Sequence, residues 1–183
     1  MIAGDAAPVG DVPPTEEVVA ELQRAVRDPA RRSEPGLLGL LVDLLRSNLQ
    51  QWNLESISRG AGGDDAAVAH AKRAIDELNG RRHQLVEAID AAFDRELEQT
   101  ATAPLATESP GMAFDRLSVL VIRVHRTELA AGEAPEAGGY AARLPVLHRQ
   151  LADLEQAIDV LVDDVHSGRR RFVPYQSLKL YGS

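Results

Sequence analysis

One segment, from Asp64 to Glu98, constrains the fold more than any other part of the chain. Its apolar residues recur at steps of three and four, which predicts one long helix with a single buried face. The residues of this apolar stripe are Val68, Ala71, Ile75, Leu78, Leu85, Ile89 and Ala92. The pattern therefore predicts a helix that packs lengthwise against other helices.

A second, polar stripe runs beside the apolar one at the same spacing. Its members are Lys72, Asp76, Asn79, His83, Glu87 and Asp90. Arg82 falls inside the apolar stripe, seven residues after Ile75 and seven before Ile89. A bundle helix needs only the apolar stripe, so these polar residues suggest a site. The alternatives are a solvated face with i,i+4 ion pairs and, for Arg82, a structural bridge to a carboxylate.

The composition favours packed helices and narrows the range of partners. The 183 residues are 44% hydrophobic but only 4% aromatic. The net charge of −8 makes nucleic acid an unsuitable partner. The chain has no cysteine, which excludes disulfides and thiolate chemistry. We expect a cytoplasmic protein without a membrane span, because the longest apolar stretch, Leu37–Leu45, is far too short to cross a bilayer.

Further periodic segments predict three more long helices and one short one. They are expected at Thr15–Arg27, Gly36–Ser58, Pro110–Leu129 and Ala141–Ser167. Thr15 and Ser109 are the expected N-caps, and Gly168 is expected to end the last helix. Residues 1–14 lack any period and are predicted to be disordered. The predicted fold is all-α: an antiparallel up-down four-helix bundle with a short extra N-terminal helix. It is one domain, 15–183, with an irregular tail at 169–183.

The helix before the glycine-rich turn also carries polar residues on its core face. Asn48, Trp52 and Glu55 continue the face that Leu41 and Leu45 begin. The hairpin turn is expected to bring Glu55 close to Lys72, and Asn48 close to Asp76. One end of the bundle would then gather these four residues and Asn79 beside the only tryptophan. The alternative is a buried polar network that fixes the helix register.

No pattern typical of a metal, cofactor or nucleophile site is present. A di-iron bundle needs two Glu-x-x-His motifs, and the chain offers only a weak variant, Asp163-x-x-His166. No glycine-rich phosphate loop or serine nucleophile elbow occurs. We therefore expect neither a metal nor a cofactor. Tyr175 and Lys179 in the basic tail indicate either a flexible end or a lid over an anion.

Four stretches together resemble the bacterial family catalogued as domain of unknown function 4254. They are Asn48-x-x-x-Trp52-x-x-Glu55-x-x-x-Arg59, Lys72-Arg73-x-Ile75-Asp76-x-x-Asn79-x-Arg81-Arg82 with Glu87 and Asp90, Glu108-Ser109-Pro110-Gly111 with Asp115-Arg116-Leu117-Ser118, and Tyr175-x-x-Leu178-Lys179-Leu180-Tyr181. Ser56, Gly80, Gln84 and Gly182-Ser183 depart from the family pattern. The resemblance implies an all-helical domain and a setting in glycan or specialised-metabolite biosynthesis, but no reaction.

The leading hypothesis is a small-molecule enzyme, or enzyme-like binding protein, acting on an anionic metabolite. A sugar nucleotide, a phosphorylated sugar or a carboxylated precursor would fit. Arg82, Arg116 and Lys179, with Tyr175, would hold the anion. Glu55 and Asp76 would act as acid and base, with Lys72 as partner or alternative base. Asn48 and Asn79 would orient the substrate, and Trp52 would form an apolar wall.

Helix geometry divides these residues between two candidate subsites. Glu55 and Lys72 should lie at the turn end of the first hairpin, and Glu87, Asp90, Asp115 and Arg116 nearer the opposite end. Fifteen helical residues separate the two ends of the stripe by about 22 Å. The rival hypothesis is a non-catalytic helical module that binds a partner enzyme or self-associates, for example as a homodimer.

Overall fold

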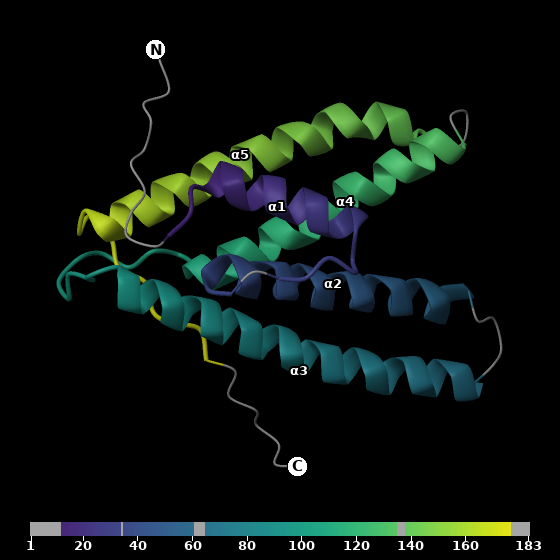
Figure 1. Ribbon diagram of the computed structural model, residues 1–183, viewed down its shortest axis with the longest axis horizontal. Helices are drawn as coiled ribbons and strands as arrows, with labels where there is room; N and C mark the ends of the chain where they lie inside the picture. Colours follow the sequence, from purple (N-terminus) through teal and green to yellow (C-terminus); the bar gives the residue numbers. More distant parts are fainter. Residues whose placement is uncertain (1–11, 34, 61–64, 135–137, 177–183) are drawn as a thin grey trace.

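The computed structural model describes residues 12–33, 35–60, 65–134 and 138–176, with the side chains of 57–60 and 65–69 excepted. The described chain forms five helices (Figure 1): α1 (Thr15–Arg27), α2 (Leu37–Gly60), α3 (Asp65–Glu96), α4 (Pro110–Glu133) and α5 (Tyr140–His166). No β-strand is assigned in these ranges, and Leu105 forms an isolated parallel bridge with Arg171. The all-α, up-down bundle prediction is confirmed.

Two antiparallel hairpins make up the bundle. Helix α2 packs along α3, and α4 packs along α5. Helix α1 contacts α2, α4 and α5, and lies between α5 and α2 (Figure 1). Among the described helices, α5 therefore contacts only α4 and α1. The short helix α1 lies beside α5 at the position that a long helix would occupy in a closed four-helix bundle.

The core lies where the two hairpins cross. Its fully buried large side chains come from all five helices and include Leu22, Leu45, Phe93, Phe114 and Ile158. The rings of Phe93 on α3 and Phe114 on α4 stack with centroids 5.7 Å apart. This contact fixes α4 against the C-terminal half of α3, which is the region that positions the candidate site.

Two helix ends follow the sequence prediction and one does not. Ser109 caps α4 by accepting a hydrogen bond from the Met112 backbone, and Pro110 is the first helical residue. Gly168 adopts a left-handed φ of 70° just after α5. The predicted Thr15 cap is wrong: Thr15 is the first residue of α1, and Pro14 holds the cap position without a side-chain hydrogen bond.

The predicted disordered segment 1–14 also needs a correction at its end. Val12 is buried in the core at 5% exposure, so ordered structure includes Val12 and the two prolines that follow it. An apolar side chain at this position adds to the burial of the short N-terminal helix. Residues 1–11 lie outside the described residues.

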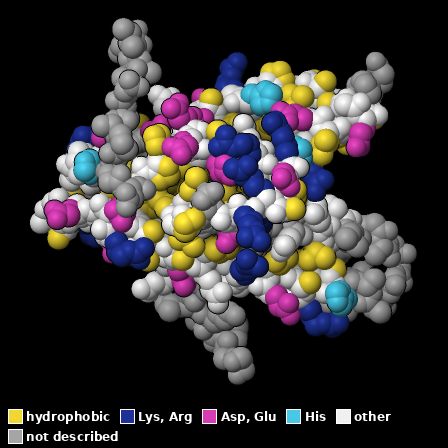
Figure 2. Space-filling model, in the orientation of Figure 1, with side chains coloured by type: hydrophobic (Ala, Val, Ile, Leu, Met, Phe, Trp, Pro, Cys, Tyr) yellow, Lys and Arg dark blue, Asp and Glu magenta, His cyan; other side chains and the backbone are white. Residues whose placement is uncertain are grey.

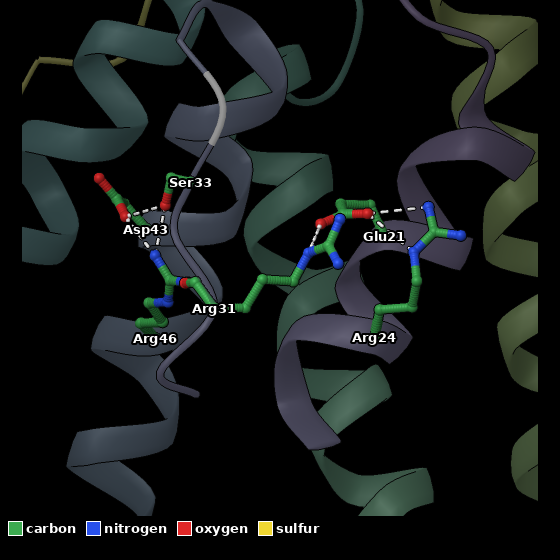
Figure 3. A network of polar contacts seen from close by, with 6 residues as sticks. All are labelled: Glu21, Arg24, Arg31, Ser33, Asp43 and Arg46. Atoms are coloured by element: carbon green, nitrogen blue, oxygen red, sulfur yellow. Dashed lines mark hydrogen bonds and ion pairs between the residues drawn. The ribbon is translucent and has the colours of Figure 1, made fainter. Parts of the chain in front are cut away.

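A polar network holds the connection between α1 and α2 (Figure 3). Glu21 accepts hydrogen bonds from Arg24 and Arg31 at 2.8 and 3.0 Å. Arg46 reaches the Ser33 hydroxyl, the Asp43 carboxylate and the Arg31 carbonyl. Figure 2 shows basic side chains gathered over α1 and the middle of α2, although the chain is acidic overall. Arg31 and Arg46 therefore hold the segment between α1 and α2 in place.

The described part of the tail is irregular but anchored. Arg171 exchanges backbone hydrogen bonds with the segment before α4, and Phe172 is buried in the core. The Phe172 backbone donates to Gln99 at 2.7 Å, and the Tyr175 backbone donates to Asp90 at 2.7 Å. The tail thus returns along α3, from its C-terminal end toward its middle.

Candidate functional site

The centre of the candidate site is an ion pair between Arg82 of α3 and Asp115 of α4. Arg82 Nε donates to Asp115 Oδ1 at 2.8 Å, and Nη2 donates to Oδ2. The hydrogen bond to Asp115 raises the pKa of Arg82. The side chain of Arg82 is 32% exposed and that of Asp115 only 10%, so the guanidinium bridges the core and the surface.

Asn48 of α2 completes this arrangement from the other hairpin. Its Nδ2 donates to Asp115 Oδ1 at 2.9 Å and to the Ser118 hydroxyl at 2.7 Å. The Ser118 hydroxyl in turn donates to the Asp115 carbonyl at 2.8 Å. The carboxylate of Asp115 is therefore held by two helices, and it fixes the orientation of the Arg82 guanidinium.

A second buried carboxylate, Asp90, joins α3, α4 and the tail. It is fully buried and accepts backbone N–H bonds from Gly111 at 2.6 Å and from Tyr175 at 2.7 Å. The Ser109 hydroxyl also bonds to it. Burial raises the pKa of Asp90, and these hydrogen bonds oppose that rise. The carboxylate lies at the N-terminus of α4, where the helix dipole favours a negative charge.

Half-buried polar groups lie around Arg82 at the surface. The rings of His83 and Tyr175 are in contact, with centroids 5.7 Å apart. Asn79 and Glu87 are half-buried and continue the same face of α3 on either side. We call Asn79, Arg82, His83, Glu87 and Tyr175 the Arg82 site. It combines a fixed guanidinium, an imidazole, a carboxylate, an amide and a phenol.

Only some of the predicted site residues meet here. Asn48, Arg82 and Tyr175 come together, and Asn79 adjoins them on α3. Asn48, which the sequence predicts near Asp76, donates its hydrogen bonds to Asp115 and Ser118 of α4. Arg116 is exposed and pairs with Glu108. Lys179 lies outside the described residues.

The residues predicted at the turn end of the hairpin remain more scattered. Lys72 and Asp76 are exposed on α3. Glu55 is half-buried and accepts a hydrogen bond from Gln51 at 3.2 Å. Trp52 is partly buried against the core. Within the described chain, no hydrogen bond or ion pair joins Glu55, Lys72 and Asp76 to one another.

Sequence reasoning missed the role of Asp115 and Ser118 as the partners of Arg82 and Asn48. Both are buried polar residues on the apolar face of α4. That interruption of an apolar face was a usable signal, because buried polar groups need partners. The polar stripe includes His83, but its spacing predicts no role for this residue.

A cavity of about 550 Å³ opens between α2 and α3, away from these residues. None of the ten predicted site residues lines it. Arg81, the neighbour of Arg82, does. Successive helical residues point about 100° apart, so one of the two arginines faces α4 and the other faces this cavity.

The family comparison places the first three of the four matched stretches in a known family. The model described as "Protein of unknown function (DUF4254)" matches residues 39–173. The chain belongs to the DUF4254 family. The match includes Asn48, Arg82 and Asp115 of this DUF4254 protein but ends before Tyr175. No curated protein and no solved structure matches the chain.

The described helices and acidic or histidine side chains were also expected to lack a membrane span and a metal site. None of the helices, as far as the chain is described, combines the length and hydropathy that a bilayer crossing requires. The described residues also contain no group of three or more His, Asp or Glu side chains arranged to hold a metal ion. The DUF4254 family description assigns no reaction.

Proposed function

We propose that this DUF4254 protein is a cytoplasmic enzyme, or enzyme-like binding protein, that acts on an anionic metabolite. A sugar nucleotide, a phosphorylated sugar or a carboxylated precursor fits best. Its setting would be bacterial glycan or specialised-metabolite biosynthesis. One observation carries this proposal: all four motif stretches of the sequence contribute residues to, or directly around, the Arg82 site.

The guanidinium of Arg82 is suited to an anion although it already has a carboxylate partner. Asp115 accepts hydrogen bonds from Nε and Nη2 of Arg82, and Nη1 takes no part in this ion pair. With 32% of the side chain exposed, Nη1 can donate to a phosphate or carboxylate without breaking the internal bonds. Because Asp115 neutralises much of the charge, Arg82 would act mainly as an oriented donor. Arg116 and Lys179 would supply further positive charge.

The exposed half of the polar stripe extends the Arg82 site along α3. Asp76 and Lys72 lie six and ten residues before Arg82, which corresponds to about 9 and 15 Å along the helix. An elongated metabolite bound at Arg82 would therefore reach both. In this proposal Asp76 and Glu55 supply acid and base, Lys72 assists them, and Asn79 orients the substrate. Trp52 provides an apolar wall, and Asn48 acts as a positioning residue through Asp115.

A non-catalytic helical module that binds a partner enzyme or forms a homodimer is the second candidate. The mutual pairing of Asn48, Arg82, Asp115 and Ser118 favours it, because a fully satisfied polar network also stabilises helix packing alone. The two candidates differ in whether a small molecule binds at Arg82.

A thermal-shift screen separates the two candidates. Sugar nucleotides, phosphorylated sugars and carboxylated metabolites are tested for a rise in melting temperature. Lys72→Ala should abolish the shift while the unliganded melting temperature stays unchanged, since Lys72 is exposed. Arg73→Ala, an exposed neighbour on the same helix, is the matched control. A ligand whose shift survives both Lys72→Ala and Arg82→Ala would refute the assigned site.

A further inference from the structure

The cavity between α2 and α3 has the size and lining of a separate ligand site. Its volume of about 550 Å³ lies within the range of small-molecule sites. Leu54 of α2 and Ala74 and Leu78 of α3 provide its apolar lining. Figure 2 shows hydrophobic side chains at the surface between α2 and α3, in the right half of that face. Apolar surface of this kind is available to cover the body of a ligand.

Two opposite charges lie on the α3 wall of the cavity. Glu77 and Arg81 both line it, both are exposed, and they are about 6 Å apart along the helix axis. This i,i+4 spacing allows a direct ion pair. Among the described residues, however, neither side chain makes an ion pair or a hydrogen bond. Both charges are therefore free to bind other groups.

The α2 wall adds an oriented amide. Arg126 of α4 donates to Asn53 Oδ1. Because an arginine can only donate, this bond fixes the carbonyl oxygen of Asn53 toward Arg126 and leaves its Nδ2 as a donor for the cavity. A carboxylate in the cavity would thus find donors on both walls, from Asn53 and Arg81.

We propose that this cavity binds a small zwitterion with an apolar side chain, of the amino-acid class. The ligand carboxylate bonds to Arg81 and the Asn53 amide, the ammonium bonds to Glu77, and the side chain covers Leu54 and Leu78. A simple anion would be repelled by Glu77, and a simple amine by Arg81. A molecule that carries an ammonium and a carboxylate on the same carbon atom satisfies both groups. This site is independent of the anion site proposed at Arg82.

Isothermal titration calorimetry of the whole chain with three probes tests the charge requirement. L-leucine carries both charges, N-acetyl-L-leucine only the carboxylate, and L-leucinamide only the ammonium. Leucine should bind at least about tenfold more tightly than either single-charge probe. Absence of saturable binding at millimolar leucine, or equal affinity for the three probes, would overturn the proposal.

Variants of the two charged residues test the location. Arg81→Gln should weaken leucine binding about tenfold and remove its advantage over leucinamide. Glu77→Gln should weaken it similarly and remove its advantage over N-acetyl-leucine. Arg73→Gln, exposed on α3 outside the cavity, is the control and should change nothing. Arg82→Ala should also leave leucine binding intact, so failure here is distinct from failure of the anion site. Leucine binding that survives both Arg81→Gln and Glu77→Gln would refute the location.

Discussion

The two halves of the polar stripe on α3 share one spacing but have opposite environments. In the C-terminal half, Asp90 bonds to α4 and the tail, and the neighbouring Arg82 of the apolar stripe bonds to α4. In the N-terminal half, Lys72 and Asp76 face solvent. The stripe therefore joins a braced region to an open one, and the Arg82 site lies at the boundary between them.

A polar residue at helical spacing can therefore be either structural or solvent-exposed, depending on which element packs against it. The packing of α4 across the C-terminal half of α3 makes the polar groups there structural and fixes their geometry. Side chains that are already rigid favour ligand binding, because they lose less conformational freedom when the ligand binds. The braced half should accordingly control stability, and the open half should control ligand chemistry.

Gly111→Ala should break the braced half most strongly. A Cβ at Gly111 would lie 2.7 Å from the Val86 carbonyl and 2.8 Å from Asp90 Oδ1. Because the first of these is backbone and the second is a buried acceptor, α4 would have to shift. We expect a loss of about 2–4 kcal/mol in the free energy of unfolding, measured by urea denaturation.

Gly132→Ala is the matched control on the same helix. No atom lies within 4 Å of a Cβ at Gly132, so this change should be neutral or stabilising by up to about 1 kcal/mol. An equal loss in the free energy of unfolding for both variants would contradict this explanation. The effect of alanine would then not come from the close contact between Gly111 and α3.

Asp115→Ala should have the next largest effect. It leaves Asn48 and Arg82 without their shared acceptor. We expect a loss of about 2 kcal/mol, reduced from the cost of a fully buried pair because Arg82 is partly exposed. Arg82→Ala in the Asp115→Ala background should cost much less than in the natural chain, and the double-mutant cycle measures this coupling.

The exposed ion pair of Arg116 with Glu108 gives the control for that cycle. Its coupling should be below about 1 kcal/mol, as is usual for surface pairs. If the two cycles give the same coupling, the Arg82–Asp115 pair is no more than a surface contact, and the contrast between the two halves of the stripe is lost.

The sequence predicted the helices well because helical period and breakers are local signals. The bounds of α1 are those predicted, and those of α3 differ by one residue at the start and by two at the end. The interruption of the apolar face of α4 indicates that Asp115 needs a partner, but it does not identify Arg82, because that pairing depends on how α4 crosses α3 after chain reversal. Asn48 shows the same limit: its burial was predicted, but the helix that it faces was not. The return of the tail to Asp90 had no periodic signal.

Asp90→Asn tests the braced half through pH. Burial raises the pKa of Asp90 in the folded state. The stability that its protonated form contributes is therefore fully present below its unfolded pKa of about 3.9 and is lost as pH rises through the folded pKa. The free energy of unfolding of the natural chain, relative to Asp90→Asn, should decrease as pH rises above about 4.

Denaturation of both proteins at a series of pH values measures this difference directly. Taking the difference between the two proteins removes the contribution of other groups, such as Glu155, whose pKa burial also raises. A difference that grows with pH would mean that the N–H bonds from Gly111 and Tyr175 outweigh the burial of the charge. Asp90 would then hold the tail more strongly in its ionised form.

Lys72→Ala and Asp76→Ala should have the smallest effect on stability and the most selective effect on binding. Both side chains are exposed, so each change should alter the free energy of unfolding by no more than about 0.5 kcal/mol. For a ligand that spans the stripe, each should still weaken binding, whereas Arg73→Ala should not. If Lys72→Ala and Asp76→Ala leave binding unchanged, the ligand contacts the braced half alone, and the open half is a solvated helix face.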